Sequence, residues 1–107
     1  MYKKIIKKLE NKNIAILGFG LEGKSTYRFI RRYLSQRITI IDQNDITTNE
    51  LLKNDSQIDF VIGPDYLNHL DQYDLIIKSP GISLKDIDIS NIKDRITSQL
   101  ELVLEVM

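Results

Sequence analysis

Short apolar runs alternate with amphipathic segments along this chain of 107 residues. Runs that are apolar throughout are typical of strands buried on both faces of a parallel sheet. We expect strands at residues 14–17 (IAIL), 38–41 (ITII), 58–62 (IDFVI) and 74–78 (DLIIK), with a short fifth strand at 95–97.

The first segment with helical spacing is 2–10, where Ile5, Ile6 and Leu9 share one side and four lysines surround the other. A basic amphipathic helix can lie on a membrane surface. The apolar face here is small, so we expect a packing helix with solvated lysines instead.

A longer helix is expected from Thr26 to Leu34, where apolar residues recur at helical spacing. Its arginines fall on other faces, and we expect all three to be solvated. They are Arg28, Arg31 and Arg32.

Three shorter helices complete the pattern. One is expected at 48–54 and one from Pro64 onward, since proline favours the first helical turn. Ser98 can cap the last, with Glu101 at the capping-box position. Strands that alternate with helices imply βαβ crossovers, so we expect a single α/β domain over residues 1–107. It would be a Rossmann-like parallel five-stranded sheet with helices on both faces.

The loop after the first strand, LGFGLEGKST, fits two phosphate-binding patterns. As G-x-G-x-x-G, Gly18, Gly20 and Gly23 form a Rossmann turn that binds the pyrophosphate of a dinucleotide or nucleotide-sugar. As G-x-x-x-x-G-K-S, Gly18, Gly23, Lys24 and Ser25 form a Walker A loop. Both patterns place backbone N–H groups at a helix N-terminus, so a phosphate ligand is the shared prediction.

The end of the second strand favours the Rossmann interpretation. Asp42 lies 19 residues after Gly23, where a Rossmann unit carries an acidic residue that accepts a hydrogen bond from a ribose hydroxyl or base N–H. In a P-loop protein Asp42 would hold magnesium, but such a protein needs more chain than this. We therefore interpret Lys24 and Ser25 as ordinary residues of the first helical turn.

The loop after the fourth strand is Ser79-Pro80-Gly81. In a doubly wound sheet the fourth strand lies beside the first at the switch point, where ligands bind. We expect the Ser79 hydroxyl and the Gly81 N–H to face the glycine loop. Taken alone, the tripeptide is equally typical of a proline turn.

Composition limits the partners. Fifteen Lys and Arg side chains cancel fifteen Asp and Glu, so no net field favours nucleic acid or an anionic membrane. The chain has no cysteine and one histidine, His69, which argues against thiolate or zinc sites and fits a reducing cytosol. No apolar run is long enough to span a membrane. We expect a cytoplasmic domain that holds no metal, with His69 on its surface.

Several motifs together resemble a known family. LGFGLEGKS follows the first strand, IID closes the second, LIIKSPGIS closes the fourth, and ITSQLELVLEV lies near the end. They resemble the N-terminal domain of the MurD family of Mur ligases, which add D-glutamate to UDP-N-acetylmuramoyl-L-alanine in bacterial peptidoglycan synthesis. The resemblance covers nearly the whole chain.

The resemblance implies that this domain holds UDP and carries no catalytic residue. The implied contacts are Gly20, Leu21, Glu22 and Gly23 for the diphosphate, Asp42, Gln43 and Asn44 for the uracil side, and Ser79 and Gly81 across the site. Two positions depart from the family, since Glu22 replaces a frequent hydroxyl residue and Gln99 a frequent acidic one. We expect Glu22 to point outward, because an inward carboxylate would repel a diphosphate.

Family members continue into a central domain that binds ATP and Mg²⁺ and then into a domain that binds the amino acid. The resemblance therefore implies an isolated first domain, which packs against the central domain in the parent ligase and is inactive alone. Two alternatives stay open from the residues themselves. They are a NAD(H)-binding Rossmann domain and a small P-loop nucleotide-binding protein.

Overall fold

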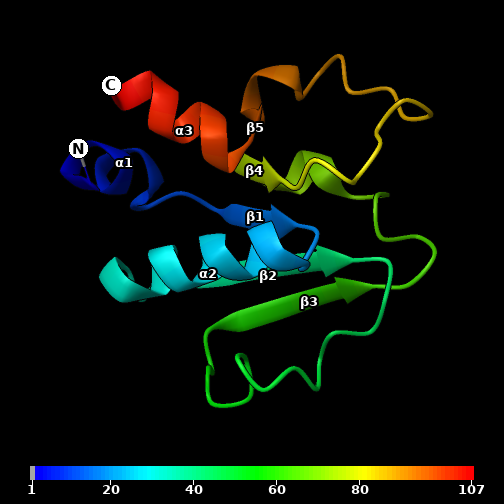
Figure 1. Cartoon of the computed structure of the whole chain (residues 1–107). Coiled ribbons are helices and arrows are strands. Elements are labelled where there is room, and N and C mark those ends of the chain that lie inside the picture. The colour runs from blue at the N-terminus through cyan, green and yellow to red at the C-terminus, as the bar shows by residue number, and fades with distance from the viewer. Residues whose placement is uncertain (1) are drawn as a thin grey trace.

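The computed structural model describes residues 2–107, apart from the side chain of Val106, and contains a parallel five-stranded sheet (Figure 1). Its strand order, β3-β2-β1-β4-β5, confirms the expected sheet and the place of the fourth strand beside the first. The strands are β1 (Ile14–Leu17), β2 (Ile38–Asp42), β3 (Ile58–Ile62), β4 (Leu75–Lys78) and β5 (Ile96–Thr97).

β1 is the central strand, and all four of its residues are buried. At its carboxyl end, Leu17 is in register with Ile41 of β2 and with Lys78 of β4. The three strands therefore end at nearly the same level. The loops that follow them meet along one edge of the sheet.

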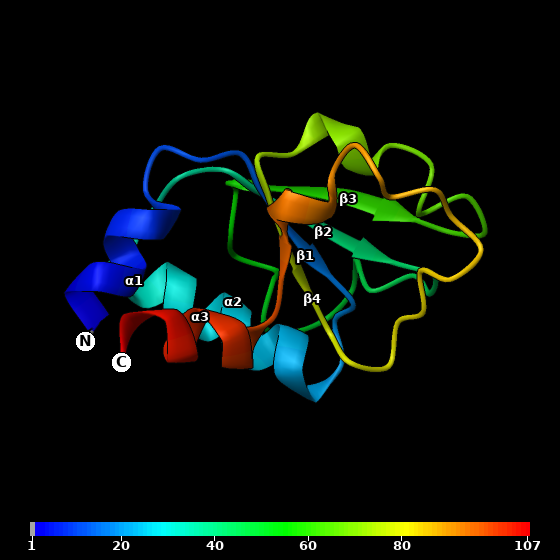
Figure 2. The ribbon, with the colours of Figure 1, turned by 90° about the horizontal axis from the view of Figure 1, so that it is seen from above.

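Three α-helices cover one face of the sheet (Figure 2): α1 (Tyr2–Leu9), α2 (Leu21–Tyr33) and α3 (Gln99–Val106). The first is a packing helix as expected, because Ile5 and Leu9 are buried in the core while its lysines are exposed. α3 begins with the expected cap, since the Ser98 hydroxyl accepts a hydrogen bond from the Glu101 N–H at 3.1 Å.

The opposite face of the sheet carries shorter helices. Two 3-10 helices, η1 (Leu70–Gln72) and η2 (Lys93–Arg95), lie there together with turns (Figure 2). Leu70 and Ile92 pack from this layer against Ala15 and Leu17 of β1. The second helical layer of the expected architecture is thus made of 3-10 turns rather than α-helix.

Two expected helices are absent from the described residues. Residues 48–54 and the segment after Pro64 form consecutive turns instead. Just before and within the first segment, the side chains of Asp45 and Asn49 accept hydrogen bonds from the backbone N–H groups of Thr47 and Leu51. Such side-chain bonds satisfy the backbone locally and compete with helix formation. After Pro64, bonds that span three residues, such as that from the Tyr66 N–H to the Gly63 carbonyl, close single turns.

A half-buried ion pair anchors the far end of α2. The Arg31 Nε lies 2.6 Å from the Asp55 Oδ2, and the Tyr27 hydroxyl donates to the same oxygen at 2.6 Å. The expectation that Arg31 is solvated is therefore wrong, whereas Arg28 and Arg32 are exposed. The Arg31 guanidinium also donates to three backbone carbonyls, those of Leu34, Gln36 and Gln57.

The ion pair shifts the pKa values of its members. Burial alone raises the pKa of the Asp55 carboxyl, but hydrogen bonds from Arg31, Tyr27 and the Gln57 N–H outweigh burial, and the pKa lies below its usual value. Burial, followed by the Asp55 carboxylate, raises the pKa of Tyr27 to about 12. At neutral pH the cluster therefore holds an ionised carboxylate and a neutral phenol.

Replacing Asp55 with Asn is expected to lower the free energy of unfolding by about 2 kcal/mol, because Arg31 keeps a half-buried charge without its carboxylate. The folded-state pKa of Asp55 is lowered, so its contribution is present above the unfolded pKa and is lost as the pH falls through the folded pKa. The difference between D55N and wild type in urea denaturation should thus shrink below about pH 4.

The control is Asp59→Asn, whose exposed carboxylate pairs with Arg37 at 2.8 Å. Exposed pairs contribute little, so this variant should cost much less than D55N. Equal losses in the two variants would contradict the special role of Asp55.

Candidate phosphate-binding cleft

A cleft of about 440 Å³ opens at the carboxyl ends of β1, β2 and β4. β1 lies at the switch point, because β2 and β4 flank it on opposite sides. Three loops line the cleft, one from each strand: residues 18–22, 42–44 and 79–82. The structure thus brings together the three loops that the sequence singled out.

The turn after β1 depends on Gly18, whose φ of +93° is strained for any other residue. The Gly18 N–H donates to the Ile41 carbonyl at 2.8 Å, and the Ser79 hydroxyl donates to the Gly18 carbonyl at 3.3 Å. A Cβ on Gly18 would lie 3.0 Å from the Ser79 side chain. Gly18 therefore joins the loop after β4 to the glycine turn.

Gly23 is buried in the first turns of α2 and lets the helix approach β1. A Cβ on this residue would collide with the Gly18 carbonyl oxygen and lie 2.9 Å from the carbonyl carbon. Of the predicted contacts, all of them in the described part of the chain, only Gly23 lies outside the lining of the cleft. Its role in the structure is close packing.

The N-terminus of α2 faces the cleft without a side-chain cap. The helix starts at Leu21, and its N-cap is Gly20. N–H groups of a first helical turn have no acceptor within the helix, and the helix dipole adds positive potential there. No atom lies within 4 Å of a Cβ built on Gly20, so an anion has room to approach the backbone. Glu22 is exposed and lines the cleft.

Asp42 holds the glycine turn from the side of β2. Its Oδ2 accepts a hydrogen bond from the Phe19 N–H at 2.8 Å, and its Oδ1 accepts one from the Asn44 N–H at 2.8 Å. A carboxylate has about four acceptor positions. Asp42 therefore fixes two loops and retains capacity to accept a further bond from a ligand.

Sequence reasoning missed part of the lining. Phe19 and Ile82 line the cleft, and Phe19 is also a core residue whose ring packs edge-on to Tyr27 at 6.0 Å. The sequence signal for this role was the position of Phe19 between Gly18 and Gly20, because an aromatic side chain inside a glycine turn is expected to pack against the core. Gly18 and Pro80 complete the lining that was not assigned as ligand contacts.

Lys78 stabilises the loop after β4 and was also missed. Its Nζ donates to the carbonyls of Ser79 at 2.9 Å and Ile82 at 2.6 Å. The ammonium group therefore stabilises the conformation of this loop through hydrogen bonds to its backbone. The signal in the sequence was a lysine that ends an otherwise apolar strand.

The Walker A interpretation does not fit the placement of the Ser25 side chain. The Ser25 hydroxyl accepts a hydrogen bond from Gln99 Nε2 at 3.1 Å and lines a different cavity. Lys24 precedes Ser25 in α2, and its N–H donates to the Gly20 carbonyl at 3.0 Å. In a Walker A loop both side chains reach the phosphate or its metal ion. The geometry favours the Rossmann interpretation.

Comparison with known proteins identifies the family. The model of the Mur ligase MurD-like N-terminal domain matches residues 12–100. The chain belongs to this family. The resemblance of the three loops and the last helix to the MurD family is thereby confirmed, and the α/β fold is the one expected for it.

Relatives of this MurD-like domain are named UDP-N-acetylmuramoylalanine--D-glutamate ligase. The one from Ligilactobacillus salivarius is 31% identical over 109 residues, which cover 96% of this chain and 23% of the relative. Those from Clostridium botulinum and Acetivibrio thermocellus are 26% and 29% identical and cover 87% and 94% of this chain. The chain spans 21–23% of the length of these relatives. No solved structure matches it.

Three further features of the MurD-like domain concern its histidine, metal-binding groups and membrane-spanning helices. His69 is exposed, as expected. Within residues 2–107, no group of three or more His, Cys, Asp or Glu side chains is arranged to hold a metal ion. Each helix in that range is too short or too polar to cross a lipid bilayer.

Replacing Gly23 with Ala in the MurD-like domain should lower the free energy of unfolding by about 3 kcal/mol, because the new methyl group meets backbone that cannot move aside. Gly20→Ala is the matched control, since its Cβ points into open space. Urea denaturation of the two variants measures the difference. A stability of G23A equal to that of G20A would show that the close approach of helix and strand is not required.

Proposed function

We propose that this MurD-like domain binds the UDP moiety of UDP-N-acetylmuramoyl-L-alanine. The observation that carries the proposal is the meeting of three loops with the open N-terminus of α2 in one cleft. A helix N-terminus is a favourable site for phosphate groups, because its free N–H groups and dipole attract negative charge. The names of the relatives support a UDP-sugar as the source of that phosphate.

The loops divide the ligand between them in this proposal. The diphosphate lies against the backbone N–H groups of Gly20, Leu21 and Glu22, and Gly23 contributes by bringing the helix close to the strand. The remaining acceptor capacity of Asp42 serves the uracil N3–H or a ribose hydroxyl. Gln43 and Asn44 border the same end, and Ser79 and Gly81 close the other side of the cleft.

The wider role follows from the family. The domain acts as the first domain of a cytoplasmic, ATP-dependent ligase that adds D-glutamate to the nucleotide-sugar. ATP and Mg²⁺ are bound by a central domain, against which this domain packs. Residues 2–107 then supply substrate affinity and position, and carry no catalytic group.

Titration calorimetry of the domain with UDP and with UDP-N-acetylmuramoyl-L-alanine tests the proposal. Gly20→Val should fold, because its side chain enters open space, but should weaken UDP binding by at least about tenfold, since the side chain occupies the approach to the N–H groups. Lys24→Ala is the control and should bind UDP nearly as well as wild type.

Three results would overturn this assignment. NAD that displaces UDP at equal concentration would favour a dinucleotide-binding domain, which uses the same glycines and Asp42. Magnesium-dependent ATP or GTP binding that is lost in Lys24→Ala would favour a P-loop protein. Absence of UDP binding at millimolar concentration would contradict the proposal directly.

A further inference from the structure

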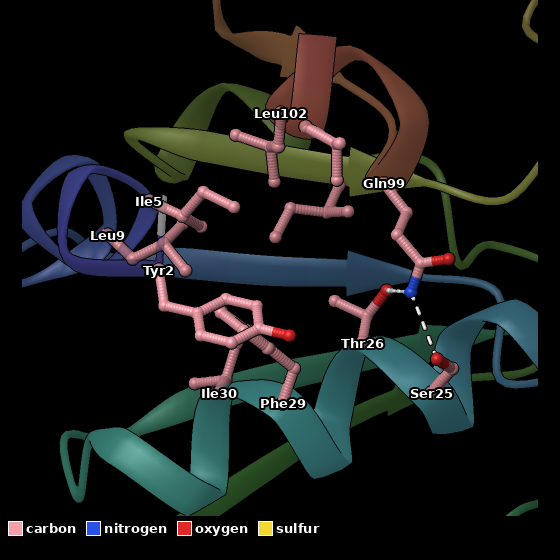
Figure 3. Close-up of a pocket in the computed structure, with 11 residues that line it drawn as sticks. Tyr2, Ile5, Leu9, Ser25, Thr26, Phe29, Ile30, Gln99 and Leu102 are labelled. Carbon is pink, nitrogen blue, oxygen red and sulfur yellow. Dashed lines mark hydrogen bonds between the residues drawn. The ribbon is translucent and has the colours of Figure 1, made fainter. Parts of the chain in front are cut away.

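A second cavity lies between the three α-helices, and its lining is separate from that of the phosphate-binding cleft (Figure 3). Its volume is about 180 Å³. Side chains of α1, α2 and α3 surround it, and Ile77 of β4 contributes from the sheet. Nothing in the proposed function uses this space.

The walls of the cavity are apolar and belong to the core. Ile5, Leu9, Ile30 and Leu102 line it, and each of them is buried. A water molecule inside a cavity needs two to four polar partners, and this apolar part of the lining offers none. An engineered apolar cavity of about 150 Å³, lined by Leu, Ile and Phe, binds benzene. The space between the helices is therefore large enough for one aromatic ring.

One end of the cavity is polar. Gln99 Nε2 donates to the Ser25 hydroxyl at 3.1 Å and to the Thr26 hydroxyl at 3.3 Å, and all three residues line the cavity. Figure 3 shows this amide bridging from α3 to α2 at one side of the apolar group. Each hydroxyl that accepts a bond still has its own proton to donate. A ligand with one polar substituent would find a partner at this end.

Polar contacts join α3 to the two neighbouring helices. At the start of α3, Gln99 ties this helix to α2. Near its end, Glu105 forms an ion pair with Lys8 of α1.

An aromatic pair borders the cavity on the side of α1. Tyr2 is 58% exposed, and its ring lies 5.7 Å from that of Phe29. Both residues line the cavity. Exposed side chains change rotamer rapidly. Rotation of the Tyr2 side chain therefore gives a small molecule access to the cavity, and the buried walls need not move.

We infer that this cavity is a binding site for a small aromatic molecule that carries one hydrogen-bonding substituent, of the phenol class. The ring lies among the apolar side chains of the three helices, and the substituent lies toward Ser25, Thr26 and Gln99. The site is independent of UDP binding. Failure of either proposal leaves the other intact.

Amide chemical-shift titrations with phenol and with benzene test the inference. Both probes should shift signals of residues that line the cavity, and phenol should bind about fivefold more tightly through one additional hydrogen bond. Val103→Phe places a ring in the cavity and should weaken both probes by at least about tenfold. Leu104→Phe adds the same ring to an exposed position of the same helix and should leave binding unchanged.

A further variant tests the polar end. The double variant Ser25→Ala/Thr26→Val removes both hydroxyl groups that line this end. It should retain benzene binding and lose the preference for phenol. If Val103→Phe fails to fold, Ser25→Phe fills the cavity from an exposed position of α2 that lines it.

The inference is overturned if neither probe binds up to its solubility limit. It is also overturned if the filled variant and Leu104→Phe bind the probes equally. Persistence of the phenol preference in Ser25→Ala/Thr26→Val would overturn the assignment of the ligand class.

Discussion

α2 rests directly on the end of β1 because no side chain separates Gly23 from the Gly18 carbonyl. This contact fixes where the helix begins, since only residues 18–20 lie between the strand and the helix. A turn this short directs the first N–H groups of α2 toward the loops after β2 and β4. The position of the phosphate-binding cleft thus follows from one close approach of backbone to backbone, and side chains adjust around it.

The charged groups near the cleft are used first to shape the backbone. The Asp42 carboxylate accepts N–H groups from two loops, and the Lys78 ammonium donates to two carbonyls of a third. A site whose loops are already ordered loses less conformational entropy when a ligand binds. The charged side chains at this edge of the sheet therefore order the loops before a ligand binds. The backbone N–H groups at the N-terminus of α2 remain free to bind the ligand.

Physical reasons separate what the sequence predicted from what it missed. Strands buried on both faces require apolar runs such as IAIL, so the strands could be predicted from the sequence. The glycine turn could be predicted from its G-x-G-x-x-G spacing. Residues 48–54 were misjudged because side chains such as that of Asn49 form turns that helical periodicity does not reveal. The role of Arg31 was hidden because its partner, Asp55, lies 24 residues away and meets it only after folding. The cleft itself was predictable, whereas the packing role of Gly23 required the distance between helix and strand.

The first and last helices of the described chain lie side by side (Figure 2), with Lys8 paired to Glu105. On the ribosome, α1 (Tyr2–Leu9) is made well before its native neighbour α3 (Gln99–Val106). The apolar side of α1, with Ile5 and Leu9, therefore lacks part of its native contacts until α3 has been made. The lysines that surround this small apolar side give the nascent helix a charged surface during that interval, which opposes premature association.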